Sequence, residues 1–155
     1  MPLFRSTPAP VLPEWIDFNG HLNMAYYNVL FDQSVDELYP LLGFGEDYVR
    51  TTGCTTYVAE FHVCYLRELH VHDRVTCSFF LVQHDAKRFH SYCEMHHTDG
   101  WLAATAEGLT LHVDQSGPKV AEMPDAIQTA LTDYAATQGP LPENARVGRR
   151  ISLKR

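Results

Sequence analysis

The 155-residue sequence lacks several features that would assign it to common functional classes. It has no Gly-x-Ser-x-Gly elbow, which disfavours a serine hydrolase, and no glycine-rich phosphate-binding loop. No stretch approaches the roughly 18 uninterrupted apolar residues of a membrane span. The proline-rich N-terminus also lacks the apolar segment of a secretion signal. We therefore expect a cytoplasmic protein that does not associate with membranes.

Cysteine and basic residues are also scarce. The four cysteines, at positions 54, 64, 77 and 93, form no Cys-x-x-Cys pair and lie in apolar or strand-like stretches, which suits reduced thiols. Only 12 Lys and Arg residues oppose 19 Asp and Glu residues, for a formal net charge of −7. Because the resulting field repels phosphate backbones, we do not expect a nucleic-acid partner.

The composition that remains is typical of one globular domain. Apolar residues make up 45% of the chain and charged residues 20%, and no internal repeat or low-complexity tract interrupts them. A chain of this length can bury a single sizeable core. We expect one domain over residues 1–155, in which the proline-rich and then basic segment from about 140 to 155 is a surface extension.

The periodicity of the apolar residues predicts the order of the elements. Steps of three and four residues from Met24 to Leu42 predict a long helix, with Asn23 as its N-cap and Pro40 and Gly43 at its end. The period then changes to two, which indicates strands. The full expectation is an edge strand over about 9–16, a loop over 43–53, strands over about 55–66, 74–84, 88–98 and 102–113, and a last helix over about 124–137.

This order predicts an α+β fold in which a long central helix is wrapped by a five-stranded antiparallel sheet. Strict alternation in the strand after Gly53 would place Tyr57, Phe61 and Tyr65 on one face. Gly108, inside the last long strand, indicates a close approach of another backbone or a bulge. Because one helix covers only one face of such a sheet, the remaining apolar surface needs a partner. We expect a homodimer or a dimer of dimers.

The stretch "EWIDFNGHLNMAYYN", residues 14–28, is where chemistry is expected. It leads directly into a helix N-terminus, whose unsatisfied amides attract anions and developing oxyanions. Asp17 and His21 can move protons, Gly20 permits a positive φ, and Asn23 can cap the helix. Each residue alone also has an ordinary structural interpretation in a turn or a cap. Their conjunction before a helix favours a site.

These residues resemble those of the hotdog-fold acyl-CoA thioesterases. The match is to the 4-hydroxybenzoyl-CoA thioesterase-like branch, in which an Asp-x-x-Gly-His-x-Asn type of turn precedes the helix; here the turn reads "DFNGHLN". The resemblance covers nearly the whole chain, including "VCYLRELHVHDRV", "HDAKRFH" and "LAATAEGLTLHVDQSGPK". More narrowly, "YLREL", "HDAKRFH" and "GLTLHVD" look like thioesterases of carnitine breakdown, a group associated with betainyl-CoA.

The resemblance implies hydrolysis of a CoA thioester, with a short or betainyl-type acyl group, to free acid and CoA without metal or organic cofactor. Asp17 would be the catalytic carboxylate, which attacks the carbonyl carbon or activates a water molecule. The amides near Met24 would polarise the carbonyl oxygen, with Gly20 allowing close backbone approach. His21 and Asn23 would orient the water molecule or the thioester.

Substrate-binding residues are expected elsewhere in the chain. In a protein of net charge −7, the phosphates of CoA need a local positive site, for which Arg67, Lys87 and Arg88 are the candidates, although basic residues at strand ends are often only solvated. Glu60 could assist the site or meet a cationic acyl group, or it could pair across the sheet. Tyr27 could contribute to an aromatic surround for a trimethylammonium group, or simply belong to the core.

Two other functions remain open from the sequence. Hotdog enoyl-CoA hydratases and dehydratases have a longer Asp-to-His spacing with a proline between, whereas Asp17 and His21 are four residues apart. A non-catalytic acyl-CoA binding module that keeps the turn for structural reasons is the second alternative. The nine histidines do not predict a metal site, because "HVH" and "HH" lack a matching set of convergent ligands.

Overall fold

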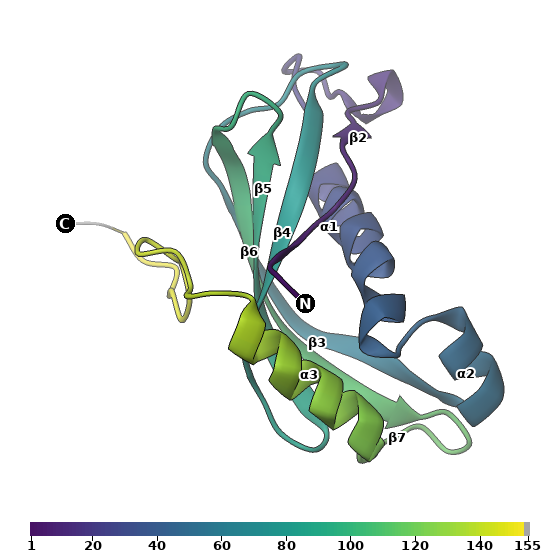
Figure 1. Ribbon diagram of the computed structural model, residues 1–155. Helices are drawn as coiled ribbons and strands as arrows, with labels where there is room; N and C mark the ends of the chain where they lie inside the picture. Colours follow the sequence, from purple (N-terminus) through teal and green to yellow (C-terminus); the bar gives the residue numbers. More distant parts are fainter. Residues whose placement is uncertain (154–155) are drawn as a thin grey trace.

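The computed structural model describes residues 1–153, which form a curved antiparallel sheet with one long helix along its concave side (Figure 1). The helices are α1 (Met24–Leu38), α2 (Glu46–Thr52) and α3 (Asp125–Thr137), with 3-10 turns at Pro13–Trp15 and Tyr39–Leu42. The strands are β1 (Phe4–Arg5), β2 (Ala9–Pro10), β3 (Cys54–Tyr65), β4 (Arg74–His84), β5 (Arg88–His97), β6 (Leu102–Asp114) and β7 (Lys119–Val120).

The main order of the sheet is β1-β4-β5-β6-β3, with β2 added beside β4 and β7 beside β6. The predicted α+β architecture, a long helix against five antiparallel strands, is therefore confirmed. The expected edge strand over 9–16 shrinks to Ala9–Pro10, because Pro13 starts a 3-10 turn instead of continuing the ladder. The two-residue strands β1 and β7 are too short to show a periodic pattern.

Helix α1 begins where the sequence predicts. The side chain of Asn23 accepts a hydrogen bond from the Ala25 amide at 3.0 Å, so Asn23 is the N-cap. The helix packs a stripe of side chains against the sheet, and this stripe forms the main core with the inner faces of β4, β5 and β6. The buried residues of α1 are Tyr27, Leu30, Phe31, Ser34 and Leu38.

The end of α1 differs from the prediction. The α-helix ends at Leu38 and continues only as a 3-10 turn over Tyr39–Leu42, because the ring of Pro40 has no N–H to donate. Gly43 then stops the turn with a φ of 90°. The expected loop over 43–53 contains the helix α2, whose seven residues are too few to reveal a helical period.

The alternation predicted for β3 is wrong at its N-terminal half. A bulge between Val58 and Glu60 shifts the register, so that Val58 pairs with Thr110 and Phe61 with Gly108 on the same face. Tyr57 therefore faces the opposite side from Phe61. The neighbour that approaches Gly108 is a side chain and not another backbone, since a Cβ there would lie 3.2 Å from the Phe61 ring. A larger residue at 108 would displace that ring.

After α3 the chain crosses to the side of the sheet away from α1 (Figure 1). The Gly148 amide donates to both carboxylate oxygens of Glu107 at 2.9 Å, which holds this segment against β6. Residues 140–153 contain no helix or strand, as expected of a surface extension, and residues 154–155 of that expectation lie outside the described residues. No helix in the described part is long and apolar enough to cross a membrane.

Tyr134 links three elements through its hydroxyl group. It donates to the Phe79 carbonyl of β4 at 2.6 Å and accepts from the Phe4 amide of β1 at 3.1 Å. Burial raises the pKa of Tyr134 to about 12, so the phenol stays protonated. We expect Tyr134→Phe to lower the free energy of unfolding by about 1–3 kcal/mol, because two buried partners lose their hydrogen bond.

Urea denaturation followed by tryptophan fluorescence measures this loss. The matched control is Tyr57→Phe, since Tyr57 is exposed and its hydroxyl has no hydrogen-bond partner within residues 1–153. Equal losses in the two variants would contradict the assigned role of Tyr134.

Candidate active site

The residues before α1 form a closed turn. Ile16 and Leu22 make an isolated antiparallel bridge, and inside it the Asp17 amide donates to the His21 carbonyl at 3.1 Å. The Gly20 amide donates back to the Asp17 carbonyl at 2.9 Å. Gly20 has a φ of 83°, a conformation that strains any other residue. The sequence thus needs glycine at this position to return the chain toward the helix.

Backbone hydrogen bonds anchor this turn to its surroundings. The Leu22 amide donates to the Leu69 carbonyl at 2.7 Å, which joins the turn to the segment after β3. The Asn23 amide donates to the Trp15 carbonyl at 3.0 Å. Because these bonds involve main-chain atoms on both sides of the turn, they fix the position of Asp17 relative to the first residue of α1.

The carboxylate of Asp17 lies beside the helix N-terminus. One oxygen accepts from the Asn19 amide at 2.8 Å, and the other lies 3.5 Å from the side-chain nitrogen of Asn23, which donates to it. Within residues 1–153 the Met24 amide has no hydrogen-bond acceptor, whereas the Ala25 amide donates to the Asn23 cap. The turn therefore holds a carboxylate next to an unpaired amide donor at the positive end of a helix.

This pairing can act on a polarised carbonyl group. An amide at a helix N-terminus stabilises negative charge that develops on a carbonyl oxygen, and losing such a donor costs on the order of a hundredfold to a thousandfold in rate in other enzymes. A carboxylate on the other side can attack the carbonyl carbon or remove a proton from water. The arrangement fits acyl transfer to water.

The five residues predicted to be catalytic occupy one turn, but they differ in their contacts. His21 takes part through its carbonyl oxygen, and its imidazole forms no hydrogen bond or ion pair within the described residues. Its role in orienting the water molecule or the thioester stays a prediction. The residues brought together are Asp17, Gly20, His21, Asn23 and Met24.

The site lies on the surface of the single chain. None of the main cavities in the described residues is lined by Asp17, and the neighbouring apolar side chains of Phe18 and Met24 are 98% and 63% exposed. The edge strand β3 also exposes apolar side chains, namely Tyr57, Val58, Phe61 and Tyr65. Apolar exposure on this scale indicates a surface that another molecule covers.

Two of the predicted binding residues lie near the turn. The guanidinium carbon of Arg67 lies 4.0 Å from the centre of the Trp101 ring, and the Arg67 side chain is exposed at the same end of the sheet as the turn. Tyr27 is only 3% exposed and its hydroxyl donates to the Arg67 carbonyl at 3.5 Å. The structure thus gives Tyr27 a packing role beneath Arg67, while Arg67 stays accessible to an anion.

The other predicted binding residues lie apart from Asp17 in the single chain. Lys87 and Arg88 belong to the β4–β5 hairpin, at the far end of a ten-residue strand about 30 Å long. Arg88 pairs with Asp85 at 2.6 Å and lowers the pKa of that carboxyl group, helped by a hydrogen bond from the Lys87 amide. Glu60 lines a pocket on the opposite face of the sheet from α1.

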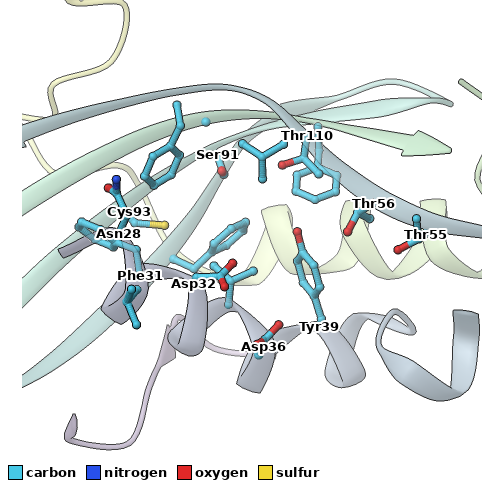
Figure 2. Close-up of a pocket in the computed structure, with 17 residues that line it drawn as sticks. Asn28, Phe31, Asp32, Asp36, Tyr39, Thr55, Thr56, Ser91, Cys93 and Thr110 are labelled. Atoms are coloured by element: carbon cyan, nitrogen blue, oxygen red, sulfur yellow. The ribbon is translucent and has the colours of Figure 1, made fainter. Parts of the chain in front are cut away.

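A cavity of about 580 Å³ opens between α1 and the concave face of the sheet (Figure 2). It begins at Asn28, one helical turn after Met24, and continues to Tyr39. Asp32 and Asp36 line it from α1, and sequence reasoning did not select them. Their spacing of four residues places both on one face of the helix, and the neighbouring positions are apolar. This pattern could have indicated them from the sequence.

Comparison with known proteins agrees with this geometry. Residues 11–131 match the Thioesterase-like superfamily, and the chain belongs to this family. Its fold is the hotdog fold, and it is a thioester hydrolase that acts on acyl-CoA, as the resemblance in the turn implies. Within the described residues, no three His, Cys, Asp or Glu side chains are placed to hold a metal ion, and the expectation of a metal-free reaction stays a prediction.

Individual proteins of known sequence or structure also resemble this chain. A betainyl-CoA thioesterase of Pseudomonas aeruginosa is 33% identical over 149 residues, which cover 93% of this chain and 91% of that protein. An L-carnitine dehydrogenase/betainyl-CoA thioesterase of Agrobacterium fabrum is 34% identical over 90% of this chain, but this match spans only 29% of that longer protein. A Staphylococcus aureus protein solved in complex with CoA superposes with a TM-score of 0.92 and 26% identity, over 98% of this chain and 96% of that one.

Two substitutions of Asn23 distinguish its effect on stability from its effect on catalysis. We expect Asn23→Ala to lower the free energy of unfolding by about 1 kcal/mol, because the Ala25 amide loses its acceptor. Asn23→Asp should keep the cap and most of the stability. It also brings a second carboxylate close to that of Asp17, so like-charge repulsion favours protonation and moves the acidic limb of the pH–activity profile to higher pH.

Thermal denaturation and the pH dependence of thiol release measure the two effects. An unchanged profile in a stable Asn23→Asp protein would contradict the proximity of Asn23 to the reacting carboxylate.

Proposed function

We propose that Asp17 and the Met24 amide together hydrolyse the thioester bond of an acyl-CoA, without metal or organic cofactor. The observation that supports this proposal is the turn, which holds the Asp17 carboxylate beside an unpaired amide at the start of α1. The carbonyl oxygen of the substrate accepts a hydrogen bond from the Met24 amide. The Asp17 carboxylate faces the carbonyl carbon.

Two balanced routes lead to the same products. In one, a carboxylate oxygen bonds to the carbonyl carbon, the carbon–sulfur bond breaks, CoA leaves as a thiolate, and water hydrolyses the anhydride. In the other, Asp17 takes a proton from a water molecule that attacks the carbon directly, the carbon–sulfur bond breaks, and the proton passes to the leaving CoA sulfur. A single turnover in heavy-oxygen water tests the anhydride route, because label enters the side chain of Asp17 only when water attacks the aspartyl carbon of an anhydride.

The exposed edge of β3 supports a homodimer. Its outer backbone groups have no strand partner within the described residues, and its apolar side chains are exposed. A second copy can pair with this edge through a two-fold axis, which makes the two β3 strands antiparallel. Because α1 starts beside Tyr65, whose hydroxyl donates to the Met24 carbonyl at 3.2 Å, and ends near Thr56, the two α1 helices are antiparallel as well.

In this dimer, the start of one α1 faces the C-terminal half of the other. The Asp17 turn, which lies outside any cavity of its own chain, then opens toward the cavity of the partner subunit. Phe18 and Met24 become covered at the same interface. We also propose that two such dimers pair into a tetramer. The protein is proposed to be cytoplasmic.

The acyl group is proposed to be betainyl or another short group. The support is the 33% identity over 93% of this chain to a betainyl-CoA thioesterase. For the CoA portion, Arg67 offers an exposed guanidinium group at the same end of the sheet as the Asp17 turn. The contribution of Lys87 and Arg88 to binding depends on the dimer, since they lie far from Asp17 in one chain.

We expect Asp17→Asn to lower kcat/KM by on the order of a thousandfold or more, because the amide is neither a nucleophile nor a base. Thiol release from a panel of acyl-CoAs measures the loss, and the melting temperature should stay close to that of the wild type. The control is Asp47→Asn, since Asp47 is an exposed carboxylate of α2.

Unchanged turnover in folded Asp17→Asn would remove Asp17 from the mechanism. Water addition to crotonyl-CoA by the wild type would support a hydratase instead, and tight CoA binding without any hydrolysis would support a binding module.

The dimer predicts a second effect. Val58→Lys should yield monomers, because the partner strand would have to bury the lysine ammonium, and activity should fall with the dimer fraction. Light scattering and thiol release at several protein concentrations measure both quantities. Val120→Lys, on the two-residue strand β7, is the control. A fully active Val58→Lys monomer would contradict a site shared between subunits.

A further inference from the structure

The cavity between α1 and the sheet is acidic at one wall and apolar over most of the rest. Asp32 and Asp36 are the charged residues of its lining, and no Lys, Arg or His lines it. Figure 2 shows both aspartates on α1, with Ser91 and Thr110 of the sheet on the other side. The aromatic residues that line it are Phe31, Tyr39, Phe61, Phe79 and Phe89.

The two carboxylates are not neutralised by the protein. Within residues 1–153 neither Asp32 nor Asp36 forms an ion pair or accepts a side-chain hydrogen bond. Partial burial raises the pKa of Asp36, and the carboxylates of Asp32 and Glu46 raise it further. The cavity therefore has a negative field that a positively charged ligand would relieve.

A second observation points to a ligand in the same space. Ser91 is only 7% exposed, yet its hydroxyl has no hydrogen-bond partner within the described residues. The hydroxyl lies at the cavity wall, beside the backbone of Gly108. The hydroxyl oxygen itself is open to the cavity, so it is placed to meet a group that enters there.

We propose that this cavity is the acyl subsite and that Asp32 and Asp36 select a positively charged acyl group. The proposal rests on the thioesterase function and names the substrate class. A trimethylammonium group fits this lining, because it has no donor to satisfy, is attracted by carboxylates, and packs its methyl groups against aromatic rings. The Ser91 hydroxyl can turn its oxygen toward the same cation.

The length of α1 decides which subunit supplies the carboxylates. Asp32 follows Met24 by eight residues, so their Cα atoms are about 12 Å apart along the helix. A betainyl group has only one carbon between its carbonyl carbon and its ammonium nitrogen, and it cannot span that distance. The Asp32 and Asp36 side chains that meet it therefore belong to the partner of the subunit that supplies Asp17.

Two substrates that differ only in charge test the selection. Betainyl-CoA and 3,3-dimethylbutyryl-CoA have the same shape, but a quaternary nitrogen in the first is a carbon in the second. The wild type should favour betainyl-CoA in kcat/KM. Asp32→Asn and Asp36→Asn should each reduce this preference by on the order of tenfold, mostly through KM.

The matched control is Asp133→Asn, which removes one exposed carboxylate from α3, outside the cavity, and should leave the preference unchanged. Both α1 variants should keep the wild-type melting temperature, because their side chains are exposed and like charges are being removed.

Mixed dimers test the sharing of the site. An Asp17→Asn subunit combined with an Asp32→Asn/Asp36→Asn subunit should recover betainyl-CoA hydrolysis, because one of the two sites then receives Asp17 and both cavity carboxylates intact. If each subunit used its own cavity, no intact site would form, and kcat/KM for betainyl-CoA would not rise above that of the Asp32→Asn/Asp36→Asn protein alone.

The outcomes separate this proposal from the one on which it rests. Hydrolysis of both substrates with equal kcat/KM, or a preference that survives the double asparagine variant, would overturn the charge selection and leave the thioesterase intact. Absence of hydrolysis with every acyl-CoA would instead overturn the proposed function itself.

Discussion

The start of α1 depends on main-chain hydrogen bonds, and the rest of the site follows from it. The Leu22–Leu69 bond ties the turn to the segment after β3, and the Asn23–Trp15 bond closes its base. With the chain held at both places, the carboxylate of Asp17 has to lie beside the first amides of the helix. Main-chain bonds of this kind tolerate changes in the surrounding side chains, so the turn can serve different acyl groups.

The shape of the cavity proposed to hold the acyl group depends on small irregularities in the sheet. The bulge between Val58 and Glu60 turns Val58 toward the same side as Phe61, which extends the apolar wall. Gly108 lets the Phe61 ring pack against β6, and Ser91 lies next to it across the ladder. In a regular sheet without the bulge and without glycine at position 108, side chains would fill this space. Position-specific small residues and one bulge therefore decide how much room lies beneath α1.

Charge is divided between the two ends of the proposed substrate. The chain has a net charge of −7, although CoA is itself an anion. Arg67, spread over the Trp101 ring, offers a local positive group near the turn, while Asp32 and Asp36 concentrate negative charge under the helix. An acyl-CoA with a cationic acyl group matches this separation, because each end meets the opposite sign.

Much of the fold, and the turn that forms the candidate site, could be predicted from the sequence. The helical period after Asn23, the period of two in the four long strands and the turn "DFNGHLN" are local signals, because each depends on residues adjacent in the chain. Helix α2, the bulge in β3 and the position of Asp32 and Asp36 in the cavity could not be predicted from the sequence. They depend on which segments meet in space, and neither spacing nor composition reports that. The sequence alone determined the long helix, the four long strands and the turn before α1. The tertiary structure decided which edge stays open and which carboxylates line a cavity, since burial and pairing arise only when distant segments pack together.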